Sequence, residues 1–240
     1  PFAHWTKQKQ TARKRYKALG AQMADAAQRL LVCGMHVHVG IDDDELRIDL
    51  LSQMTYFLPH LLALSTSSPF WEGRNTGLKS YRVTVIDGLP RSGLPEHFSS
   101  YGEYQRHVDV LVHAGLIKDA TMIWWDLRPS ARYPTLETRI FDICTDINDS
   151  VCLAAMTMCI LRCLYRLRLG NRRWRQYSSL LLNENRWRAM RYGSDEGLID
   201  LAKGKLVGFR HLLEEILGKI DEDAKFFGCE AEVARARKIV

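Results

Sequence analysis

The chain has 240 residues, of which 46% are hydrophobic and 26% are charged, so it can bury one sizeable core. Its formal net charge of +6 suits an anionic ligand such as a nucleotide, but charge alone is weak support for nucleic-acid binding. No stretch of about 18 uncharged apolar residues occurs, which predicts no membrane span. The six cysteines form no C-x-x-C pair and residues 1–15 hold no apolar signal segment, so we expect a cytoplasmic protein with reduced thiols.

Residues 11–31 form the first predicted element, a stretch rich in Ala, Arg, Lys, Gln and Leu that contains no proline. Apolar residues recur in it at helical spacing, and its intrinsic helix propensity is high. Together these features predict an amphipathic helix. The helix would lead directly into residues 33–40 and leave little room for a loop.

Residues 33–40 are predicted to form a strand, in which successive side chains point to opposite faces. His36 and His38 then share one face. The other face is apolar and holds Met35, Val37 and Val39. Two histidines on one sheet face suit a metal or phosphate site. Surface histidines or hydrogen-bonded core histidines would give the same pattern, so the neighbouring strands must decide between these readings.

An acidic cluster precedes the next predicted helix. Residues 42–45 are all Asp or Glu, and such residues at a helix start supply an N-cap and complement the helix dipole. This structural role is favoured over metal binding. The helix that follows, over residues 46–64, is strongly apolar on one side, and Pro59 inside it predicts a kink.

Residues 65–100 are dominated by Ser, Gly, Pro and Arg. A connection of this length within a compact domain is either disordered or functional. Aromatic residues and three arginines, Arg74, Arg82 and Arg91, argue against disorder. We therefore predict that residues 65–100 form an ordered loop that lines the substrate site.

Two further strands are predicted, over residues 122–128 and 135–143, and each would place ionisable side chains on one face. In the first strand that face holds Trp124, Asp126 and Arg128. In the second it holds Glu137, Arg139 and Phe141. A solvated sheet face would also explain the pattern, but pairs of His, Asp–Arg and Glu–Arg are more typical of a polar cavity.

The rest of the chain is predicted to be mostly helical. Apolar periodicity predicts helices over residues 101–116, 148–169, 178–192 and 209–220. Three cysteines, Cys152, Cys159 and Cys163, fall on the apolar face of one of these helices, where core packing is favoured over metal ligation. The basic turn at residues 171–175 carries a Trp and could touch nucleic acid, but a solvated helix end is the favoured explanation.

Several motifs in fixed order resemble a known family. They are residues 34–40 (GMHVHVG), 80–82 (SYR), 90–95 (PRSGLP), 125–130 (WDLRPS), 136–142 (LETRIFD) and 185–193 (NRWRAMRYG). As a set they resemble the bacterial carboxylate–amine ligases of the second glutamate–cysteine ligase type. The His-x-His and Glu-x-Arg strands are also similar to glutamine synthetase, with which that family shares a catalytic fold. The resemblance implies an α+β fold, in which an antiparallel sheet curves around a polar cavity and helices pack on its other face.

The resemblance also implies an ATP-dependent ligase. ATP would phosphorylate a substrate carboxylate, such as the γ-carboxylate of glutamate, and an amine such as that of cysteine would attack the acyl phosphate. Phosphoryl transfer needs divalent metal ions that bridge phosphate oxygens, and cations where negative charge spreads. The implied cofactors are therefore ATP and Mg²⁺ (or Mn²⁺).

The family resemblance suggests roles for three residues on the metal and nucleotide side of the site. By its position in the Glu-x-Arg motif, Glu137 would be a metal ligand. His36 would be a second ligand to metal or phosphate. His38 would contact the nucleotide phosphates or orient the site.

Five arginines match positions in the same motifs. Arg139 and Arg128 would stabilise the transferring phosphoryl group or the acyl phosphate, and Arg128 would also contact the nucleotide. Arg82 would hold a substrate carboxylate or a phosphate, since a guanidinium binds both anions bidentately. Arg186 and Arg191 are further candidates for nucleotide binding, but structural ion pairs would explain them equally well.

The sequence departs from the family at its start. Family members are longer, and their N-terminal strands supply further acidic metal ligands that nothing in residues 1–31 resembles. One carboxylate and one histidine make a poor octahedral magnesium site. We therefore expect residues 1–240 to be a single catalytic domain equivalent to the C-terminal two-thirds of a ligase, glutamine-synthetase-like with an incomplete sheet. We expect little or no ligase activity from it alone.

The leading interpretation is an ATP-dependent carboxylate–amine ligase that works through an acyl phosphate. It would be a cytoplasmic homo-oligomer that takes amino-acid substrates and ATP, and that binds neither nucleic acid nor membrane. A related acyl-phosphate chemistry, the phosphorylation of a guanidino or amino-acid substrate, is one alternative. Another is a catalytically inactive nucleotide-binding or interaction module, which metal-dependent ATP binding without ADP formation would favour.

Overall fold

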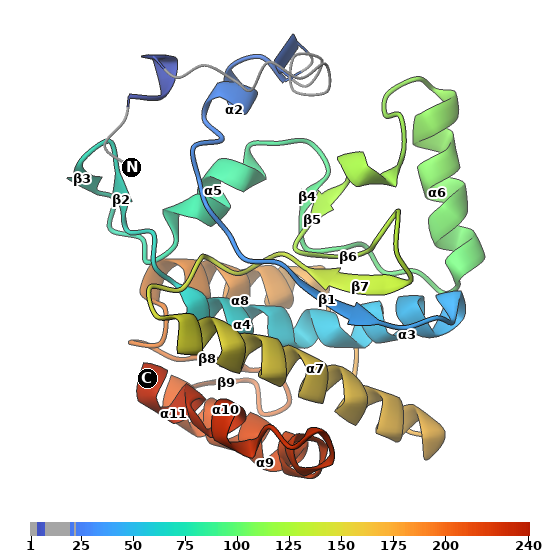
Figure 1. Ribbon diagram of the computed structural model, residues 1–240, viewed down its shortest axis with the longest axis vertical. Coiled ribbons are helices and arrows are strands. Elements are labelled where there is room, and N and C mark those ends of the chain that lie inside the picture. Colours follow the sequence, from blue (N-terminus) through green and yellow to red (C-terminus); the bar gives the residue numbers. More distant parts are fainter. Residues whose placement is uncertain (1–3, 8–19, 22) are drawn as a thin grey trace.

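The computed structural model describes residues 4–7, 20–21 and 23–240, and a small antiparallel sheet lies at its centre (Figure 1). The sheet has the order β1-β7-β6, formed by β1 (Val37–Gly40), β6 (Leu127–Pro129) and β7 (Thr135–Thr138). Glu137 of the central strand is in register with His38 on one side and with Arg128 on the other. This register places ionisable side chains from three separate segments on one sheet face, as the α+β interpretation predicted.

Helices cover the opposite face of the sheet, and α3 (Asp44–Met54) lies directly against it (Figure 1). The predicted acidic N-cap is confirmed, because the Asp43 carboxylate accepts a hydrogen bond of 2.6 Å from the Leu46 N–H. Helix α3 passes through the 3₁₀ turn η2 (Thr55–Phe57) into α4 (Leu58–Ser65). Pro59 lies in the first turn of α4, where its missing N–H costs no helix bond. Instead of the predicted kink within one helix, the chain changes from the 3₁₀ turn η2 to the α-helix α4 just before Pro59.

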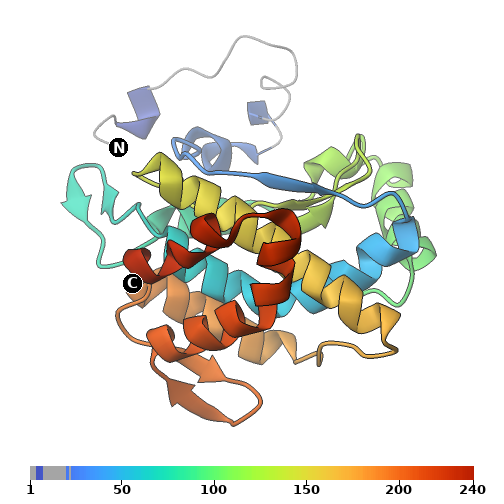
Figure 2. The same cartoon turned by 60° about the horizontal axis from the view of Figure 1, so that its bottom comes forward.

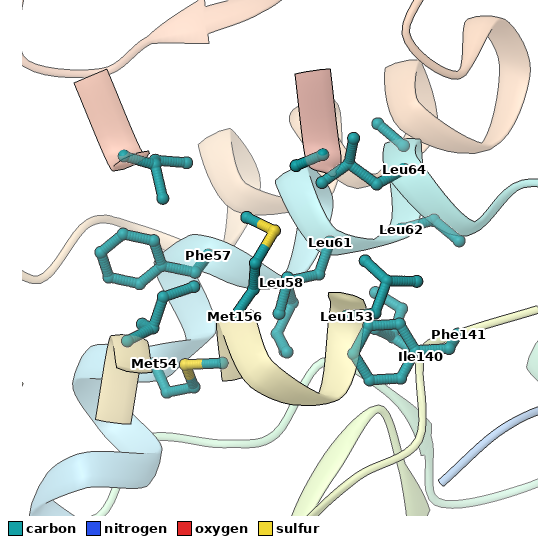
Figure 3. Close-up of a cluster of buried hydrophobic side chains, with 14 of the residues drawn as sticks. Met54, Phe57, Leu58, Leu61, Leu62, Leu64, Ile140, Phe141, Leu153 and Met156 are labelled. Atoms are coloured by element: carbon teal, nitrogen blue, oxygen red, sulfur yellow. The ribbon is translucent and has the colours of Figure 1, made fainter. Parts of the chain in front are cut away.

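The main hydrophobic core lies where α4 and α7 (Ile147–Leu169) meet the segment that follows β7 (Figure 3). All eight residues of α4 are buried. A helix that is apolar on every side is stable only inside a protein. Leu58, Leu61 and Phe141 have no measurable exposure, and burying each such side chain contributes about 1.5–3 kcal/mol.

Among the described residues, α7 is the one helix with the length and apolar composition of a membrane-crossing segment. Nine of its residues are nevertheless buried against other parts of the protein, and it packs on α9 (Phe209–Phe227) and α10 (Glu230–Ala234). Cys152 and Cys159 are fully buried there, and Cys163 is partly buried against the same core, which confirms their predicted packing role. The place of α7 in the core accounts for its buried apolar residues, whereas Ile147 and Leu169 at its two ends are exposed.

A second layer lies on the side of the sheet away from the main core (Figure 1). Its elements are α5 (Tyr81–Asp87), β4 (Ser92–Gly93), α6 (Tyr101–His113), η3 (Ala120–Met122) and β5 (Trp124–Trp125). Strands β4 and β5 pair in parallel, and α6 packs over a small core of its own that includes Phe98 and Tyr104. The polar face of the sheet is turned toward this layer (Figure 1).

The prediction that residues 65–100 form one loop is wrong in its secondary structure. The segment contains the hairpin β2 (Phe70–Trp71)–β3 (Arg74–Asn75), the helix α5 and the strand β4. Its Ser, Gly and Pro residues fall largely at the turns between these short elements, where such residues are favoured. Its assignment to the substrate site stays a prediction.

The prediction for residues 11–31 is only partly testable, since residues 11–19 and 22 lie outside the described part of the chain. After the short turn η1 (Trp5–Lys7), the helix named in this region is α2 (Asp25–Gln28), and the chain then runs without helix to β1. A helix that reaches residue 31 is therefore wrong. Gly34 already pairs with Asp142 in an isolated bridge, so the preceding residues must extend to reach the sheet.

The two strand predictions after residue 120 are shortened by bends. Residues 122–128 divide into β5 and β6 at Asp126. Strand β7 ends at Thr138, and Phe141 turns into the main core instead of sharing a face with Glu137. In both cases the alternation of side chains holds only up to the bend, because a bend changes the direction in which the next residues point.

The C-terminal third is helical as predicted, and Figure 2 shows its last helices packed in front of α7. Helix α8 (Ser179–Tyr192) matches its predicted range within one residue at its start. The hairpin β8 (Leu198–Asp200)–β9 (Lys205–Val207) was not predicted. Helix α9 extends beyond its predicted end, and α11 (Ala236–Ile239) closes the chain.

Candidate functional site

The ionisable residues of the sheet converge on the carboxylate of Glu137. Its Oε1 lies 2.6 Å from Arg139 Nη1 and 3.2 Å from His36 Nδ1. Its Oε2 lies 2.9 Å from Arg128 Nε, and His38 Nε2 lies 3.8 Å from Oε1. Five residues predicted from the sequence are thus brought together, and we refer to them as the Glu137 cluster: His36, His38, Arg128, Glu137 and Arg139.

The Glu137 carboxylate is charged and its charge is more than balanced. Burial alone would raise the pKa of Glu137, but hydrogen bonds from His36 and Arg128 and the charges of Arg128 and Arg139 hold it well below the usual range. Burial and the neighbouring Arg128 charge lower the pKa of Arg139. Two guanidinium groups share one carboxylate, so the cluster keeps a positive charge that an anion can neutralise.

The two histidines form the open side of the cluster. Each side chain is 39% exposed, whereas the Glu137 side chain is 5% exposed. His38 Nδ1 lies 2.8 Å from Thr135 Oγ1, and this contact turns its Nε2 toward Glu137. Thr135 was missed by the sequence analysis. It stands two residues before Glu137 on the same strand face, which is the signal that could have identified it.

Arg128 also joins the sheet to the layer above it. Its Nη1 donates hydrogen bonds to the backbone carbonyls of Thr121, at 3.1 Å, and of Ile123. One guanidinium therefore fixes both the Glu137 carboxylate and the turn that leads into β5. The predicted role of Arg128 at a phosphoryl group stays a prediction, and its position on the polar face beside Glu137 is compatible with that role.

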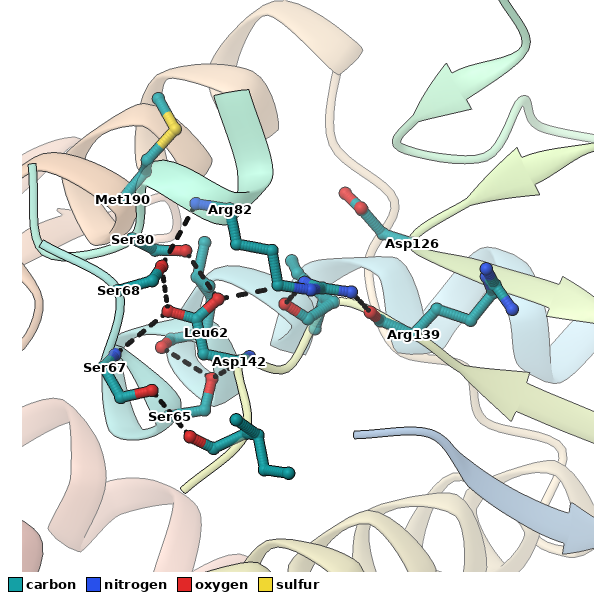
Figure 4. Close-up of polar contacts among 12 residues, drawn as sticks. Leu62, Ser65, Ser67, Ser68, Ser80, Arg82, Asp126, Arg139, Asp142 and Met190 are labelled. Carbon is teal, nitrogen blue, oxygen red and sulfur yellow. Dashed lines mark hydrogen bonds and ion pairs between the residues drawn. The ribbon is translucent and has the colours of Figure 1, made fainter. Parts of the chain in front are cut away.

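Arg82 lies behind the cluster and is 6% exposed (Figure 4). Its Nη2 donates to the Arg139 carbonyl at 2.8 Å and its Nη1 donates to the Ile140 carbonyl at 3.1 Å. Gly34 makes this approach possible, because a Cβ on it would lie 2.4 Å from Arg82 Nε. These contacts favour a role in positioning the Arg139 backbone, and the predicted contact of Arg82 with substrate stays a prediction.

The carboxylate of Asp142 anchors the same network and is completely buried (Figure 4). Its Oδ2 accepts hydrogen bonds from the Ser67 N–H at 2.9 Å and the Ser68 hydroxyl at 2.7 Å. Its Oδ1 accepts from the Ser80 hydroxyl at 2.8 Å and lies 3.9 Å from Arg82 Nη1. The serines that begin the 65–100 segment are therefore ligands of a buried charge, which must be hydrogen-bonded to be tolerated.

Arg186 belongs to a second buried network. Its Nε donates to Asp126 at 2.6 Å, and both of its terminal nitrogens donate to Asp87 at 2.7 Å. Burial alone would lower the pKa of Arg186, but the charges and hydrogen bonds of Asp126 and Asp87 raise it above the usual range. Asp126, which was predicted to share a face with Arg128, pairs with Arg186, whereas Arg128 pairs with Glu137.

Arg191 is not brought into the Glu137 cluster. Its Nη1 donates to the Gly77 carbonyl, and its guanidinium lies 4.9 Å from the ring centre of Tyr192. Like Arg186, it has the structural partners that the sequence analysis kept as the alternative explanation. Nucleotide binding by Arg186 and Arg191 stays a prediction.

The described residues do not provide a complete set of ligands for Mg²⁺. Among them, no group of three or more His, Cys, Asp and Glu side chains is placed to hold a metal ion. Mg²⁺ prefers an octahedron of oxygen ligands, whereas both oxygens of Glu137 already accept arginine hydrogen bonds. Glu137 and His36 offer part of a site at most, so their metal role stays a prediction.

Comparison with known proteins places these observations in context. The model of the glutamate-cysteine ligase family 2 (GCS2) matches residues 1–240, the whole chain. Three similar proteins bear the name "Putative glutamate--cysteine ligase 2". The protein of Rhodospirillum rubrum is 59% identical to this chain over 240 residues, and the protein of Jannaschia sp. is 52% identical over 239 residues. The protein of Chloroflexus aurantiacus is 43% identical over 240 residues. Each alignment covers 100% of this chain but 62% or 63% of the relative. The chain thus spans about three-fifths of the length of these relatives.

Proposed function

Because this chain belongs to the glutamate-cysteine ligase family 2, we propose that it supplies the acyl-phosphate site of an ATP-dependent carboxylate–amine ligase. The family membership that the ordered motifs predicted is confirmed. The names of the relatives support glutamate as the carboxylate substrate and cysteine as the reference amine.

The Glu137 cluster is the observation that carries this proposal. It holds two guanidinium groups at one shared carboxylate, next to two partly exposed histidines on the polar face of the sheet. Phosphoryl transfer spreads negative charge over the phosphoryl oxygens, and fixed cations stabilise that charge at no cost of reorganisation. Arginine suits this task because its planar fork can bind two oxygens of a phosphate at once.

The proposed reaction has two steps. First, a carboxylate oxygen of the substrate attacks the γ-phosphorus of ATP, the bond to the β,γ-bridging oxygen breaks, and ADP leaves. Next, the amine nitrogen attacks the carbonyl carbon of the acyl phosphate, inorganic phosphate leaves, and the nitrogen loses a proton to give the amide. Arg128 and Arg139 would stabilise the phosphoryl oxygens in the first step and the departing phosphate in the second.

Further parts of the proposal rest on the family and on coarser features. A glutamine-synthetase-like catalytic fold is supported by the antiparallel sheet with one polar face and one face covered by helices. A cytoplasmic location is supported by six cysteines that are all free thiols. Mg²⁺ or Mn²⁺ is the implied cofactor and would require oxygen ligands beyond Glu137. The predicted homo-oligomeric state stays a prediction.

Hydroxylamine trapping tests the proposal directly. An acyl phosphate reacts with hydroxylamine to give a hydroxamate, so ATP, Mg²⁺, glutamate and hydroxylamine should yield glutamyl hydroxamate and ADP in equal amounts. The assay compares the 240-residue chain with a chain of the relatives' length. No hydroxamate from either chain would contradict the proposal, and ATP binding without ADP formation would favour an inactive nucleotide-binding module.

A further inference from the structure

The buried residue Asp126 connects the Glu137 cluster to the layer above the sheet. It is 5% exposed and stands at the bend between β5 and β6. Its N–H donates to the carbonyl of Gly93 in β4 at 2.8 Å, and its own carbonyl accepts from the Arg139 N–H at 2.7 Å. The backbone of one arginine of the cluster is therefore held by a residue that lies outside the cluster.

The backbone of Arg139 is held on both sides, and Figure 4 shows Arg82 and Asp126 next to it. Its carbonyl accepts from Arg82 Nη2 at 2.8 Å, and its N–H donates to the Asp126 carbonyl. The backbone angles of a residue decide which side-chain rotamers it can adopt. These two hydrogen bonds therefore restrict the direction of the Arg139 guanidinium, which reaches Glu137 at 2.6 Å.

The position of Asp126 depends in turn on Arg186 of α8. The Nε of Arg186 donates to Asp126 Oδ2 at 2.6 Å, and its Nη2 lies 3.3 Å from Asp126 Oδ1. Nη1 and Nη2 each donate to the carboxylate of Asp87, in α5, at 2.7 Å. Arg186 is 7% exposed, and a buried ion pair resists opening because either partner alone would be an uncompensated charge. One guanidinium thus ties α8 and α5 to the bend at Asp126.

These contacts leave Arg186 poorly suited to bind a phosphate. All three of its guanidinium nitrogens already donate to carboxylates, and the two carboxylates outnumber the one guanidinium. A phosphate would have to displace one carboxylate and lie next to the other, and like charges at such distances repel. The Glu137 cluster has the opposite balance, with two guanidinium groups and one carboxylate.

We propose that Arg186 is a positioning residue for the ligase reaction, which acts through Asp126 on the backbone of Arg139 and so directs the Arg139 guanidinium toward the phosphoryl oxygens. This inference rests on the proposed function and extends it beyond the groups that touch substrate. A fixed cation lowers the barrier only if it is in place before the charge develops, and a displacement of about 1 Å can cost about 10²-fold in rate.

The kinetics of hydroxamate formation test the proposal in a chain of the relatives' length. Arg186→Met should lower kcat at least tenfold and change the KM values for ATP and glutamate less than twofold, because Arg186 contacts neither. Arg166→Met is the matched control, since Arg166 also donates two hydrogen bonds to a buried carboxylate, that of Asp223, at 2.9 and 2.7 Å. It should lower the unfolding temperature but leave kcat unchanged.

Two kinetic results would overturn the proposal. If folded Arg186→Met keeps the kcat of Arg166→Met, Arg186 contributes to stability alone. If the KM for ATP rises while kcat stays constant, Arg186 is a nucleotide ligand instead. Asp126→Asn provides the same test should Arg186→Met fail to fold, because it keeps the size of the side chain and removes the charge that Arg186 holds. It should lower kcat at least threefold, and an unchanged kcat would contradict the proposed link.

Amide hydrogen exchange measures the link from Arg186 to Arg139 without any activity. In NMR spectra of the 240-residue chain, Arg186→Met should speed exchange of the Arg139 N–H at least tenfold relative to the Ile41 N–H. The Ile41 N–H is the internal reference, since it is bonded at 2.8 Å to the Pro134 carbonyl at the other end of β1. Arg166→Met should leave this ratio of exchange rates unchanged, because its effect on stability is not confined to the bend.

The two measurements separate failure of this inference from failure of the proposed function. Hydroxamate formation by the parent chain, with an unchanged exchange ratio in Arg186→Met, would overturn the positioning role and leave the ligase function standing. Faster exchange at Arg139 without hydroxamate from the parent chain would contradict the ligase function and, with it, the role of Arg186 in that reaction.

Discussion

Two regions of the molecule use arginine in different ways. In the Glu137 cluster, Arg128 and Arg139 share one carboxylate on the polar face of the sheet, so one of the two positive charges is not balanced within the cluster. Behind that face, Arg82 and Arg186 lie in buried networks whose carbonyls and carboxylates satisfy them. The four arginines occupy matching motif positions, but Arg128 and Arg139 share a single carboxylate, whereas Arg186 alone is paired with two. Residue type alone therefore does not predict how completely the charge of an arginine is balanced in the folded chain.

The largest expected effect concerns the open face. In a chain of the relatives' length, Arg139→Met should lower the rate of hydroxamate formation by about 10²–10³-fold, the usual cost of losing one donor to a transition-state anion. The unfolding free energy should fall less than it does in Arg82→Met, because Arg128 still pairs with the buried Glu137 carboxylate when Arg139 is removed. Arg237→Met, which breaks an exposed pair with Glu214, is the matched control and should affect neither quantity. Full activity in Arg139→Met would remove the distinction between the two regions.

The buried network should respond in the opposite way. Arg82→Met would leave the Arg139 and Ile140 carbonyls and the Asp142 carboxylate without a cation, and should lower the unfolding free energy by about 3–5 kcal/mol. Urea unfolding followed by circular dichroism measures this loss. An unfolding midpoint equal to that of the parent chain would show that Arg82 is not a structural arginine.

The pH dependence of the unfolding free energy tests the same contrast between buried and exposed side chains, because His60 is buried and His36 is partly exposed. Complete burial lowers the pKa of His60 to about 4, and its Nδ1 has no partner among the described residues. The unfolded chain binds this proton at a higher pH than the folded chain. Stability is therefore complete above pH 6.5, the ordinary pKa of histidine, and should fall by about 3 kcal/mol as the pH drops to 4.

His60→Phe should reduce this acid sensitivity, because the replacement cannot take up a proton. Unfolding measured between pH 7 and pH 4 would reveal the difference in slope between the two chains. His36→Phe is the comparison on the open face, where the side chain is 39% exposed. Identical slopes for His60→Phe and the parent chain would contradict the assigned cause.

The smallest expected effect concerns the contact between the two regions. Gly34→Ala would place a Cβ 2.4 Å from Arg82 Nε and should lower the unfolding free energy by about 1–3 kcal/mol through overpacking. In an Arg82→Met background the same substitution should cost less, since the obstructing guanidinium is gone. Strictly additive costs in the double variant would show that Gly34 and Arg82 do not act together.

The sequence was most informative where one local pattern governs the structure. The spacing of apolar residues predicted α6, α7 and α8 nearly in full, because a helix follows a single period and needs one apolar face or a buried position. Strand alternation predicted that His36 and His38 lie opposite Met35, Val37 and Val39. It also predicted that Glu137 and Arg139 share a face, which agrees with the 2.6 Å contact between their side chains.

The errors fall where the chain bends. Residues 122–128 divide at Asp126, so two residues with strand spacing, Asp126 and Arg128, contact different partners. The helix expected up to residue 31 ends early, because Gly34 must reach the sheet edge. In the 65–100 segment, short elements of two residues each were read as loop, since they are too short to show a period.

By itself, then, the sequence determined the family, the long helices and the five residues of the Glu137 cluster, since ordered motifs and local periodicity carry that information. Only the tertiary structure decided which arginines face the open sheet and which are enclosed. That choice depends on partners far away in the chain, such as Asp142 for Arg82 and Asp87 for Arg186. A charged side chain is structural or available according to whether burial supplies its counter-charges, and burial is a property of the folded chain.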